Sequence, residues 1–502
     1  MIVIASASAD TYITNKIIDA LPAVSGNVGR AGTLDLFKLY DENLEVTGTL
    51  ELSRLLIKFD LSKALTLASS SLDIGDSTFR ATLKLQNISA GQPVPNNFTV
   101  QVFPLAVEFS EGFGRDVISF ADVDATNFLS RSVGTLWNVT GAYKSGTLGN
   151  SSIDYFASGN LQDGNGTVNL GSTRYFEIGT EDLIVDVTRV VSATIAGILP
   201  DNGFRISFID SEEGDQVTRF VKRFASRHVR EQSLRPSLII SSDDSIIDNH
   251  SSSYFDTTGT LSLRNIVRGA YRNLVSGSSL VEVTGHNCLL VNISTGSYTK
   301  WITGSQVMQG GGITGLYTAS LAIASSDTSV ISGSLTIARA LQASGSITFN
   351  ETWQSLDRTV TFFSGTLVMS SLQAGTVSSE NRKIRTAMPS LPSQLQRGSS
   401  AKFRLAVYDD WEQNKSARFS YDPVPLQVTD CRYRVRDTSS GKLLFDFDVP
   451  GSRMSIDTLS PYAMLYTDAL PIGIPLQFEF RIKIDGTDTE LTSKNFVTIV
   501  SE

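Results

Sequence analysis

Apolar side chains recur at every second position along much of this chain. Three C-terminal segments show this most clearly: Phe478 to Ile484, Phe445 to Val449, and Phe403 to Val407. Such alternation is typical of a β-strand with one buried and one wet face. Helical periodicity appears mainly over residues 183–194, and because that stretch is β-branched it also fits a strand followed by one short helix. The pattern predicts an all-β protein.

The composition agrees with this class and suggests several domains. Charged residues make up 19% of the chain, below the roughly 25% typical of soluble proteins. Ser, Thr and Gly fill much of the difference and favour strands and turns over long helices. At roughly 150 residues per domain, 502 residues predict about three domains. Polar segments at 243–252 and 384–393 mark the boundaries, which gives domains 1–242, 250–380 and 385–502.

The second and third domains are predicted to be Ig-like β-sandwiches. Residues 385–502 hold at least four alternating strands, with a hairpin loop at 437–442. The Ser/Thr/Gly-rich second domain contains two similar segments twelve positions apart, 332–337 and 344–349. Because the echo does not continue, it indicates successive strands of a sandwich and not a solenoid.

The charge balance opposes nucleic-acid binding. The net charge is −9 and the pI is about 5.1, whereas a protein that binds the phosphate backbone needs a concentrated positive face. One basic stretch stands out, and a solvated strand-and-turn surface is the simplest explanation for it. Its residues are Lys222, Arg223, Arg227, His228 and Arg230.

The cysteines and the absence of targeting segments suggest synthesis in a reducing compartment. Cys288 and Cys431 lie 143 positions apart, so we expect two free thiols, with Cys431 buried on the apolar face of its strand. The first residues lack the positive start of a secretory signal, and no apolar run reaches 18 residues. We therefore expect synthesis in a cytoplasm, no membrane insertion, and release by another route such as cell lysis.

Residues 1–242 carry an ordered set of short motifs. They are Ala9 to Ile13, Ser53 to Ser62, Ala81 to Leu85, Glu108 to Gly112, Trp137-Asn138, Val185 to Thr188, Asn202 to Phe204, Phe224 to Arg227, and Leu234 to Leu238. Together they resemble the DNRLRE family, although Phe109 stands where the family usually has Trp and the eponymous string is absent. The resemblance implies a jelly-roll sandwich similar to carbohydrate-binding modules. Leu55, Ile57 and Phe59 would then share one strand face.

The C-terminal domain has a second, looser resemblance. The run from Ile384 through Leu405, the strand from Tyr433 to Asp437, and Phe445-Asp446 are similar to virion proteins of tailed bacteriophages. This resemblance covers about the last 120 residues. It implies a virion protein made in the host cytoplasm, and the scarcity of cysteine agrees with that setting.

The sequence contains no recognisable catalytic motif. The three histidines, His228, His250 and His286, are far apart, and we interpret all three as surface or turn residues. No HExxH pair, zinc-type Cys/His spacing, Walker loop or nucleophile turn is present. We therefore predict a protein that is not an enzyme and assign it no catalytic, cofactor-binding or metal-binding residues.

Three acidic segments remain as candidates for calcium: residues 210–215, 41–45 and 163–166. Carboxylate and amide oxygens suit Ca²⁺, but a solvated turn is the simpler explanation of each segment. The segment at 163–166 has part of a calcium-loop pattern without the closing glutamate. We favour solvated turns for all three.

The leading functional prediction is a structural component of a tailed-phage virion: a neck, collar, tail or fibre-attachment protein acting through protein–protein contacts. Its partners would be other virion proteins and further copies of itself in a symmetric assembly. The alternatives are a capsid decoration protein or a carbohydrate-binding adhesin, whose partner would be a host-surface glycan. The four tryptophans offer no single sugar platform, because they are spread over all three domains: Trp137, Trp301, Trp353 and Trp411.

Overall fold

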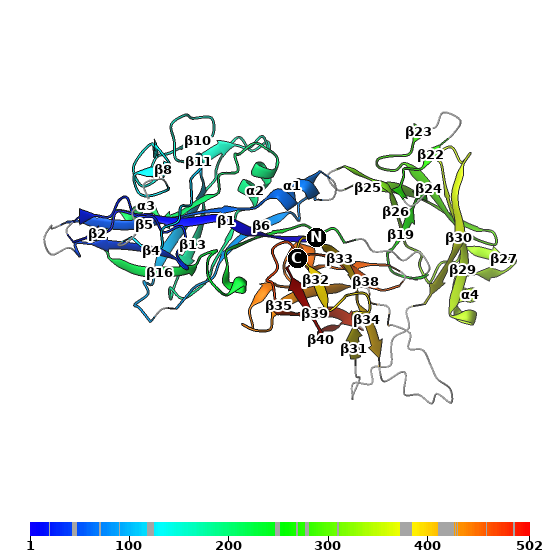
Figure 1. The fold of residues 1–502 in the computed structure, drawn as a ribbon. Coiled ribbons are helices and arrows are strands. Elements are labelled where there is room, and N and C mark those ends of the chain that lie inside the picture. The colour runs from blue at the N-terminus through cyan, green and yellow to red at the C-terminus, as the bar shows by residue number, and fades with distance from the viewer. Residues whose placement is uncertain are drawn as a thin grey trace.

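The computed structural model confirms the all-β class, with 50% strand and 8% helix. Figure 1 displays three β-rich units in chain order, blue to green, green to yellow, and orange to red. The structure describes residues 1–502 except 20, 43–47, 70–71, 90, 118–124, 246–251, 268–269, 277–280, 309–310, 372–383, 410–425, 427, 429, 458, 485–486 and 502. Several of these gaps fall on the two predicted boundaries, so the division at 242–250 and 380–385 stays a prediction.

The N-terminal unit is a β-sandwich whose first strand belongs to both sheets. Residues 2–6 of β1 pair with β17, and after a bulge residues 9–14 pair with β5. One sheet has the order β1-β17-β6-β14 and the other β13-β7-β15-β5-β1, with β4 and β16 extending from β5. The elements are β1 (Ile2–Thr14), β2 (Ile17–Ile18), β3 (Leu21–Pro22), β4 (Thr33–Tyr40), β5 (Leu50–Phe59), α1 (Ser62–Ala68), β6 (Arg80–Leu85), β7 (Phe98–Pro104), β8 (Ser130–Ser132), β9 (Thr135–Leu136), β10 (Ser145–Thr147), β11 (Tyr155–Asn160), β12 (Thr167–Asn169), β13 (Ser172–Phe176), β14 (Leu183–Asp186), α2 (Thr188–Ile195), β15 (Phe204–Phe208), α3 (Asp210–Glu213), β16 (Arg219–Ala225), the 3-10 helix η1 (Gln232–Leu234) and β17 (Ser237–Ser241).

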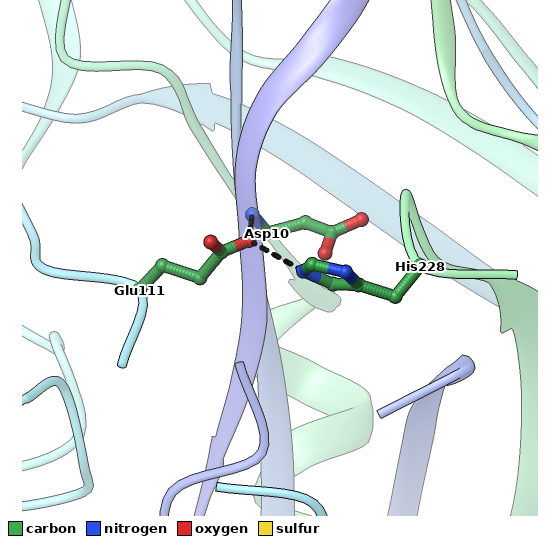
Figure 2. Close-up of side chains that lie close together, drawn as sticks. All are labelled: Asp10, Glu111 and His228. Atoms are coloured by element: carbon green, nitrogen blue, oxygen red, sulfur yellow. Dashed lines mark hydrogen bonds and ion pairs between the residues drawn. The ribbon is translucent and has the colours of Figure 1, made fainter. Parts of the chain in front are cut away.

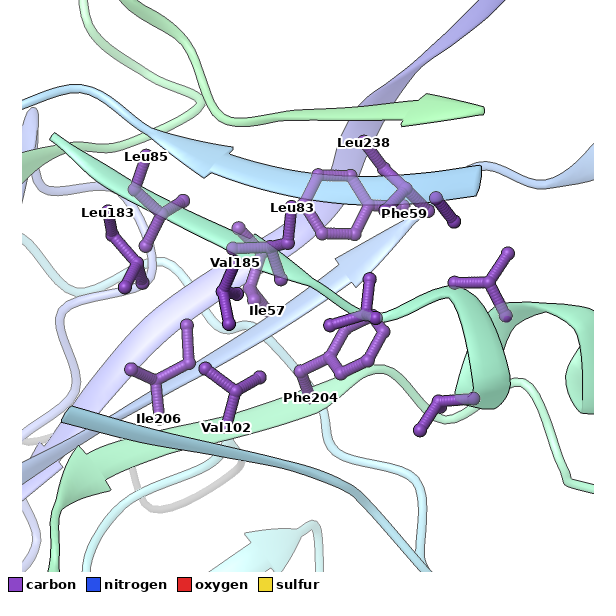
Figure 3. Close-up of a cluster of buried hydrophobic side chains, with 14 of the residues drawn as sticks. Ile57, Phe59, Leu83, Leu85, Val102, Leu183, Val185, Phe204, Ile206 and Leu238 are labelled. Atoms are coloured by element: carbon purple, nitrogen blue, oxygen red, sulfur yellow. The ribbon is translucent and has the colours of Figure 1, made fainter. Parts of the chain in front are cut away.

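Alternating side chains from the two sheets meet in the core of this sandwich. Figure 3 shows Leu83 and Val185 from one sheet facing Ile57 and Ile206 from the other. Leu55, Ile57 and Phe59 share this buried face, as their alternation predicts. The opposite face of β5 is also covered, because Leu56 joins a small second cluster with Trp137. The predicted strand-then-helix reading of residues 183–194 is confirmed by β14 and α2.

The middle unit is built on one seven-stranded sheet with the order β18-β30-β29-β24-β25-β26-β19. Of the two similar segments, 344–349 leads into the long strand β29, whereas 332–337 runs through β28 into helix α4. The prediction of two successive strands is therefore wrong for segment 332–337. Thr336 caps α4 by accepting a hydrogen bond from the Arg339 amide, and Gly345 ends it in a left-handed conformation. The elements are β18 (Ser252–Tyr254), β19 (Gly259–Arg264), β20 (Ile266–Val267), β21 (Ala270–Tyr271), β22 (Val275–Ser276), β23 (Val281–Glu282), β24 (Leu289–Thr295), β25 (Tyr298–Met308), β26 (Gly312–Leu321), β27 (Val330–Ser332), β28 (Leu335–Thr336), α4 (Ile337–Ser344), β29 (Ser346–Gln354) and β30 (Thr361–Ser370).

The C-terminal unit combines a five-stranded sheet, β32-β40-β39-β35-β36, with smaller sheets β33-β38-β37 and β31-β34. Phe478, Phe480 and Ile482 alternate into its core as predicted, and Cys431 is fully buried on β35. The boundary segment at 384–393, which the sequence leaves as a linker or a strand edge, begins with strand β31, which pairs with β34. The elements are β31 (Ile384–Ala387), β32 (Gln394–Gln396), β33 (Ser400–Arg404), β34 (Ala406–Asp409), β35 (Cys431–Asp437), β36 (Leu443–Phe445), the 3-10 helix η2 (Pro450–Ser452), β37 (Ser455–Ile456), β38 (Pro461–Tyr466), β39 (Pro475–Ile484) and β40 (Thr487–Val500).

The N-terminal and C-terminal units share hydrophobic core. Ile2 and Ile239, on the outer face of the β1-β17 pair, belong to the same buried cluster as Phe403 and Phe478. Hydrogen bonds frame this contact: the Lys84 ammonium donates to the Leu443 carbonyl, and the Lys442 ammonium donates to Gln86. In Figure 1 these two units lie against each other, while the middle unit stands to one side.

Candidate functional site

The acidic segment at 210–215 is neutralised by the protein's own cations. Both oxygens of Glu213, which is buried, accept hydrogen bonds from Arg54 at 3.0 and 2.7 Å. Arg219 and Lys38 contact Asp215, and the hydrogen bond from Arg219 holds the pKa of that carboxyl well below its usual range. The prediction of a solvated turn is wrong here, because the segment forms ion pairs with strands β4, β5 and β16.

In the other two acidic segments, the described carboxylates Asp163 and Asp41 accept hydrogen bonds from nearby backbone amides. The Asp163 carboxylate is exposed and accepts a hydrogen bond from the Asn165 amide two residues on. The Asp41 carboxylate accepts one from the Gly48 amide, and residues 43–45 of that segment lie outside the described part of the chain. The same is true of His250 and Trp411, whereas His286 is exposed as predicted.

The basic stretch in β16 and the loop that follows it is not the solvated surface that its sequence suggests. Lys222 is fully buried and donates to Asn87 and to the carbonyls of Gly179 and Glu181, at 2.6 to 2.8 Å. Burial lowers its pKa to about 8. Arg223 forms an ion pair with Asp35 through two hydrogen bonds, and Arg227 forms a similar pair with Glu111. Of the five basic residues, only Arg230 is exposed. These pairings need partners far away in sequence.

One cluster brings together three side chains that could share a metal ion. Within the described part of the chain, Asp10, Glu111 and His228 each offer one ligand atom, and these atoms lie within 4.8 Å of one another. Asp10 lies on β1, Glu111 in the loop after β7, and His228 just after β16. Figure 2 shows the three side chains converging beside β1.

Arg227 binds both carboxylates of the cluster. Its guanidinium donates two hydrogen bonds to the carboxylate of Glu111, while its backbone amide donates to Asp10 Oδ2 at 2.6 Å. Glu111 Oε1 also accepts the backbone amide of Asp10 at 2.9 Å and lies 3.4 Å from His228 Nε2. The cluster therefore joins three segments that are more than 100 residues apart.

Asn27 fixes the loop that carries Glu111. Its side chain is fully buried and donates to the carbonyls of Glu111 and Thr126 at 2.8 and 2.7 Å. Its Oδ1 accepts the amides of Gly29 and Gly114. A Cβ on Gly114 would lie 1.8 Å from the Asn27 carbonyl, so only glycine allows this close approach.

The environment shifts the titration of the cluster towards neutral species. Burial, reinforced by the nearby Glu111 charge, raises the pKa of Asp10 to about 7, against the opposing hydrogen bond from the Arg227 amide. Burial and the Arg227 charge lower the pKa of His228. An imidazole in this setting is neutral near pH 7, and a neutral imidazole offers a lone pair to a cation or proton.

Sequence reasoning did not find this cluster. The sequence alone predicts a surface position for His228, and the segments around Asp10, Glu111 and Arg227 indicate only the fold. All three segments belong to the ordered motif set of residues 1–242. Polar residues inside such motifs were the available signal, because a buried strand position such as Asp10 favours an apolar side chain unless a partner is present.

The remaining chemical candidates are structural. Cys288 is half-buried and Cys431 is buried, and both are free thiols. Trp137 and Trp353 are buried, with their indole nitrogens bonded to the Asn127 carbonyl and to Glu351. The face of Trp301 is covered by the Arg358 guanidinium at 4.2 Å. In the described residues, no helix is long and apolar enough to cross a membrane.

Comparisons with known proteins find only weak structural similarity. No family model matches the chain, and no curated protein matches it. Among solved structures, the tandem Ig repeats of Dlar match 43% of this chain and 82% of their own at 5% identity, with a TM-score of 0.14. The plexin A4 extracellular region matches 44% of this chain and 26% of its own at 11% identity, with a TM-score of 0.13. The resemblance to the DNRLRE family stays a prediction.

Proposed function

We propose that this chain is a structural component of a tailed-phage virion, at a neck, collar, tail or fibre-attachment position, and that it acts through protein–protein contacts. It would be made in the host cytoplasm and assembled as one of several copies with other virion proteins. The resemblance of the last 120 residues to virion proteins motivates this proposal. The all-β build agrees with it, as do the ion pairs that the segments at 210–215 and 222–227 form within the protein.

The observation that most supports the proposal is the surface of the middle unit. Only 11 of the 119 residues from 252 to 370 are Asp, Glu, Lys or Arg, about half the share in the whole chain. Two small hairpins, β20-β21 and β22-β23, carry exposed apolar side chains, among them Ile266, Tyr271 and Val281. Depletion of charge with enrichment of aromatic and aliphatic groups is typical of the centre of a protein–protein interface.

The adhesin alternative gains nothing from the three tryptophans that the structure describes. Sugar-binding surfaces present flat aromatic rings to solvent, but Trp137 and Trp353 are buried and Trp301 is covered by an arginine. We therefore keep the structural role as the proposed function.

Antibodies against the purified chain test the proposal directly. We expect them to label intact particles at one defined position in electron micrographs. Purified virions that lack the chain would refute it, and labelling confined to a distal tip that also binds glycan would favour the adhesin.

A matched pair of variants tests the contact surface. Val281→Asp places a charge on an exposed apolar hairpin position, and Thr299→Asp places the same charge on an exposed polar position of β25. We expect Val281→Asp to reduce incorporation into particles and Thr299→Asp to leave it unchanged. Equal incorporation of both variants would remove the hairpins from the interface.

A further inference from the structure

Asp10 has a buried carboxylate oxygen that the protein leaves without a partner. The residue is 1% exposed, and its Oδ2 accepts the Arg227 amide, while its Oδ1 is buried with no hydrogen bond. A buried carboxylate oxygen without a donor is costly, so such groups are normally paired, protonated or bound to a metal. Figure 2 shows the Asp10 carboxylate on the side of the His228 ring.

His228 offers a second unpartnered atom at the same place. Its Nε2 is buried and makes no hydrogen bond, although Glu111 Oε1 is 3.4 Å away. Metal–ligand distances of about 2.0–2.2 Å place two donors of a tetrahedral ion about 3.4 Å apart. The His228 ring and the Glu111 carboxylate are therefore close enough to share one ion.

The charges that contact one another in the cluster do not cancel when Asp10 is ionised. When Asp10 is ionised, the two carboxylates carry two negative charges, and the Arg227 guanidinium offsets one of them. Arg235 and Arg30 also lie near the cluster and keep their positive charges, although Arg235 donates to the Val229 carbonyl and Arg30 lies over the Phe113 ring at 4.5 Å. Glu111 Oε1 already accepts the Asp10 amide and Arg227, whereas Oε2 accepts only Arg227 and keeps lone-pair capacity for an ion.

We propose that Asp10, Glu111 and His228 bind one divalent transition-metal ion of the Zn²⁺ class. One imidazole nitrogen and two carboxylate oxygens suit Zn²⁺ well, with water completing the shell, and suit Ca²⁺ poorly because Ca²⁺ takes six to eight oxygens. The ion fastens β1 to the loop after β7 and to the segment after β16. Its role is structural, because it cross-links parts of the sandwich that are remote in sequence.

The full chain, stripped with a chelator and returned to metal-free buffer at pH 7.5, is the material for the test. Titration with ZnCl₂ should give one ion per chain by calorimetry and by elemental analysis. Saturating Zn²⁺ should raise the Tm of the N-terminal unit by about 5 °C. CaCl₂ at the same concentration should leave the Tm unchanged.

Variants assign the binding to the cluster. Asp10→Asn and His228→Gln should each lower Zn²⁺ affinity at least tenfold and abolish the Tm rise, with circular dichroism confirming that both still fold. His286→Ala removes an exposed histidine outside the cluster and should bind as the wild type does. Absence of stoichiometric binding, or binding that survives both cluster variants, overturns the proposal. It is also overturned if acidification to pH 6 raises the Tm while Zn²⁺ does not, because Asp10 Oδ1 is then satisfied by a proton.

Discussion

Charged residues of this protein are held by partners that are remote in sequence, and Arg404 with Asp457 is a clear case. The guanidinium donates to both carboxylate oxygens at 2.7 and 2.6 Å, and Asp457 also accepts the amides of Leu459 and Ser460. Burial by itself raises the pKa of Asp457, but the bonds from Arg404 and the two amides outweigh it and bring the pKa to about 2.

Asp457→Asn should therefore weaken the C-terminal unit in a pH-dependent way. A folded pKa of about 2, below the ordinary 3.8, means that the pair stabilises the fold fully above pH 3.8 and loses this contribution as the pH falls through 2. At about 1.4 kcal/mol per pKa unit, the loss at pH 7 is about 2 kcal/mol. Urea unfolding between pH 2 and 7 measures the loss of stability. Asp448→Asn, at an exposed carboxylate of the same unit, is the control. An unchanged pH profile in Asp457→Asn would contradict the prediction.

The two thiols should differ sharply in reactivity. Burial raises the pKa of Cys431 far above its usual range, and burial also raises that of the half-buried Cys288. Because the thiolate is the reactive form, a thiol reagent at pH 8 should label Cys288 slowly and Cys431 only after unfolding. Mass spectrometry of the labelled protein checks this. A Cys288–Cys431 bridge in non-reduced protein would show the prediction to be wrong.

At the scale of single elements, the junction of β5 and β15 depends on a glycine. Gly203 has φ +88°, and a Cβ there would lie 2.3 Å from the Ile57 carbonyl. Gly197 has φ +75° but no atom within 4 Å of its would-be Cβ. Gly197→Ala should therefore cost about 1 kcal/mol from backbone strain alone, and Gly203→Ala about 3 kcal/mol or more. Thermal unfolding of the two variants measures the difference. Equal losses would mean that the close approach is unimportant.

Alternation predicts which residues face a core but not which strand lies beside them. Phe403, Leu405 and Val407 are all buried as expected, yet the segment is two strands: β33 pairs with β38, and β34 pairs with β31. Burial periodicity is a local property, whereas strand pairing depends on residues about 20 to 60 positions away. The chain can therefore change sheets at Leu405 without disturbing the pattern.

The candidate metal site escaped prediction for the same reason. The ordered motifs around Asp10, Glu111 and Arg227 indicated where strands and loops fall, and nothing local indicated that the three meet. Lys222 illustrates the reverse error, because a lysine in a basic run suggests solvent, while its actual partners are Asn87 and two carbonyls. Long-range pairing decides the chemistry of polar residues in a sandwich of this kind.

At the scale of the whole molecule, the strand pair β1-β17 is buried on both faces. Leu238 and Ile240 face the N-terminal core, and Ile239 between them faces the C-terminal core. The continuous apolar run Leu238-Ile239-Ile240 agrees with this, because strands covered on both sides lose their polar alternation. The apolar run therefore predicts a strand that is buried on both faces. It does not predict that the C-terminal unit covers the second face.

A charge on the outer face should therefore destabilise two units together. Ile239→Asp places a carboxylate in the C-terminal core and should cost about 3–5 kcal/mol. Ile184→Asp is the matched control, because Ile184 lies on β14 of the same sheet and is exposed. Calorimetry should show Ile239→Asp lowering the transitions of both the N-terminal and C-terminal units, and Ile184→Asp lowering neither much. An unaffected C-terminal transition would contradict a shared core.

The shared core also means that one face of the N-terminal unit is covered only late in synthesis. β1 and β17 leave the ribosome early, but the strands that cover their outer face begin only at Ile384. At about 5–20 residues per second, tens of seconds separate Ser241 from the end of β40. During that interval the newly folded sandwich exposes Ile2 and Ile239 to solvent. A polypeptide released after the middle unit keeps that apolar face bare, and it will associate with other copies or with chaperones instead of remaining in solution as a monomer.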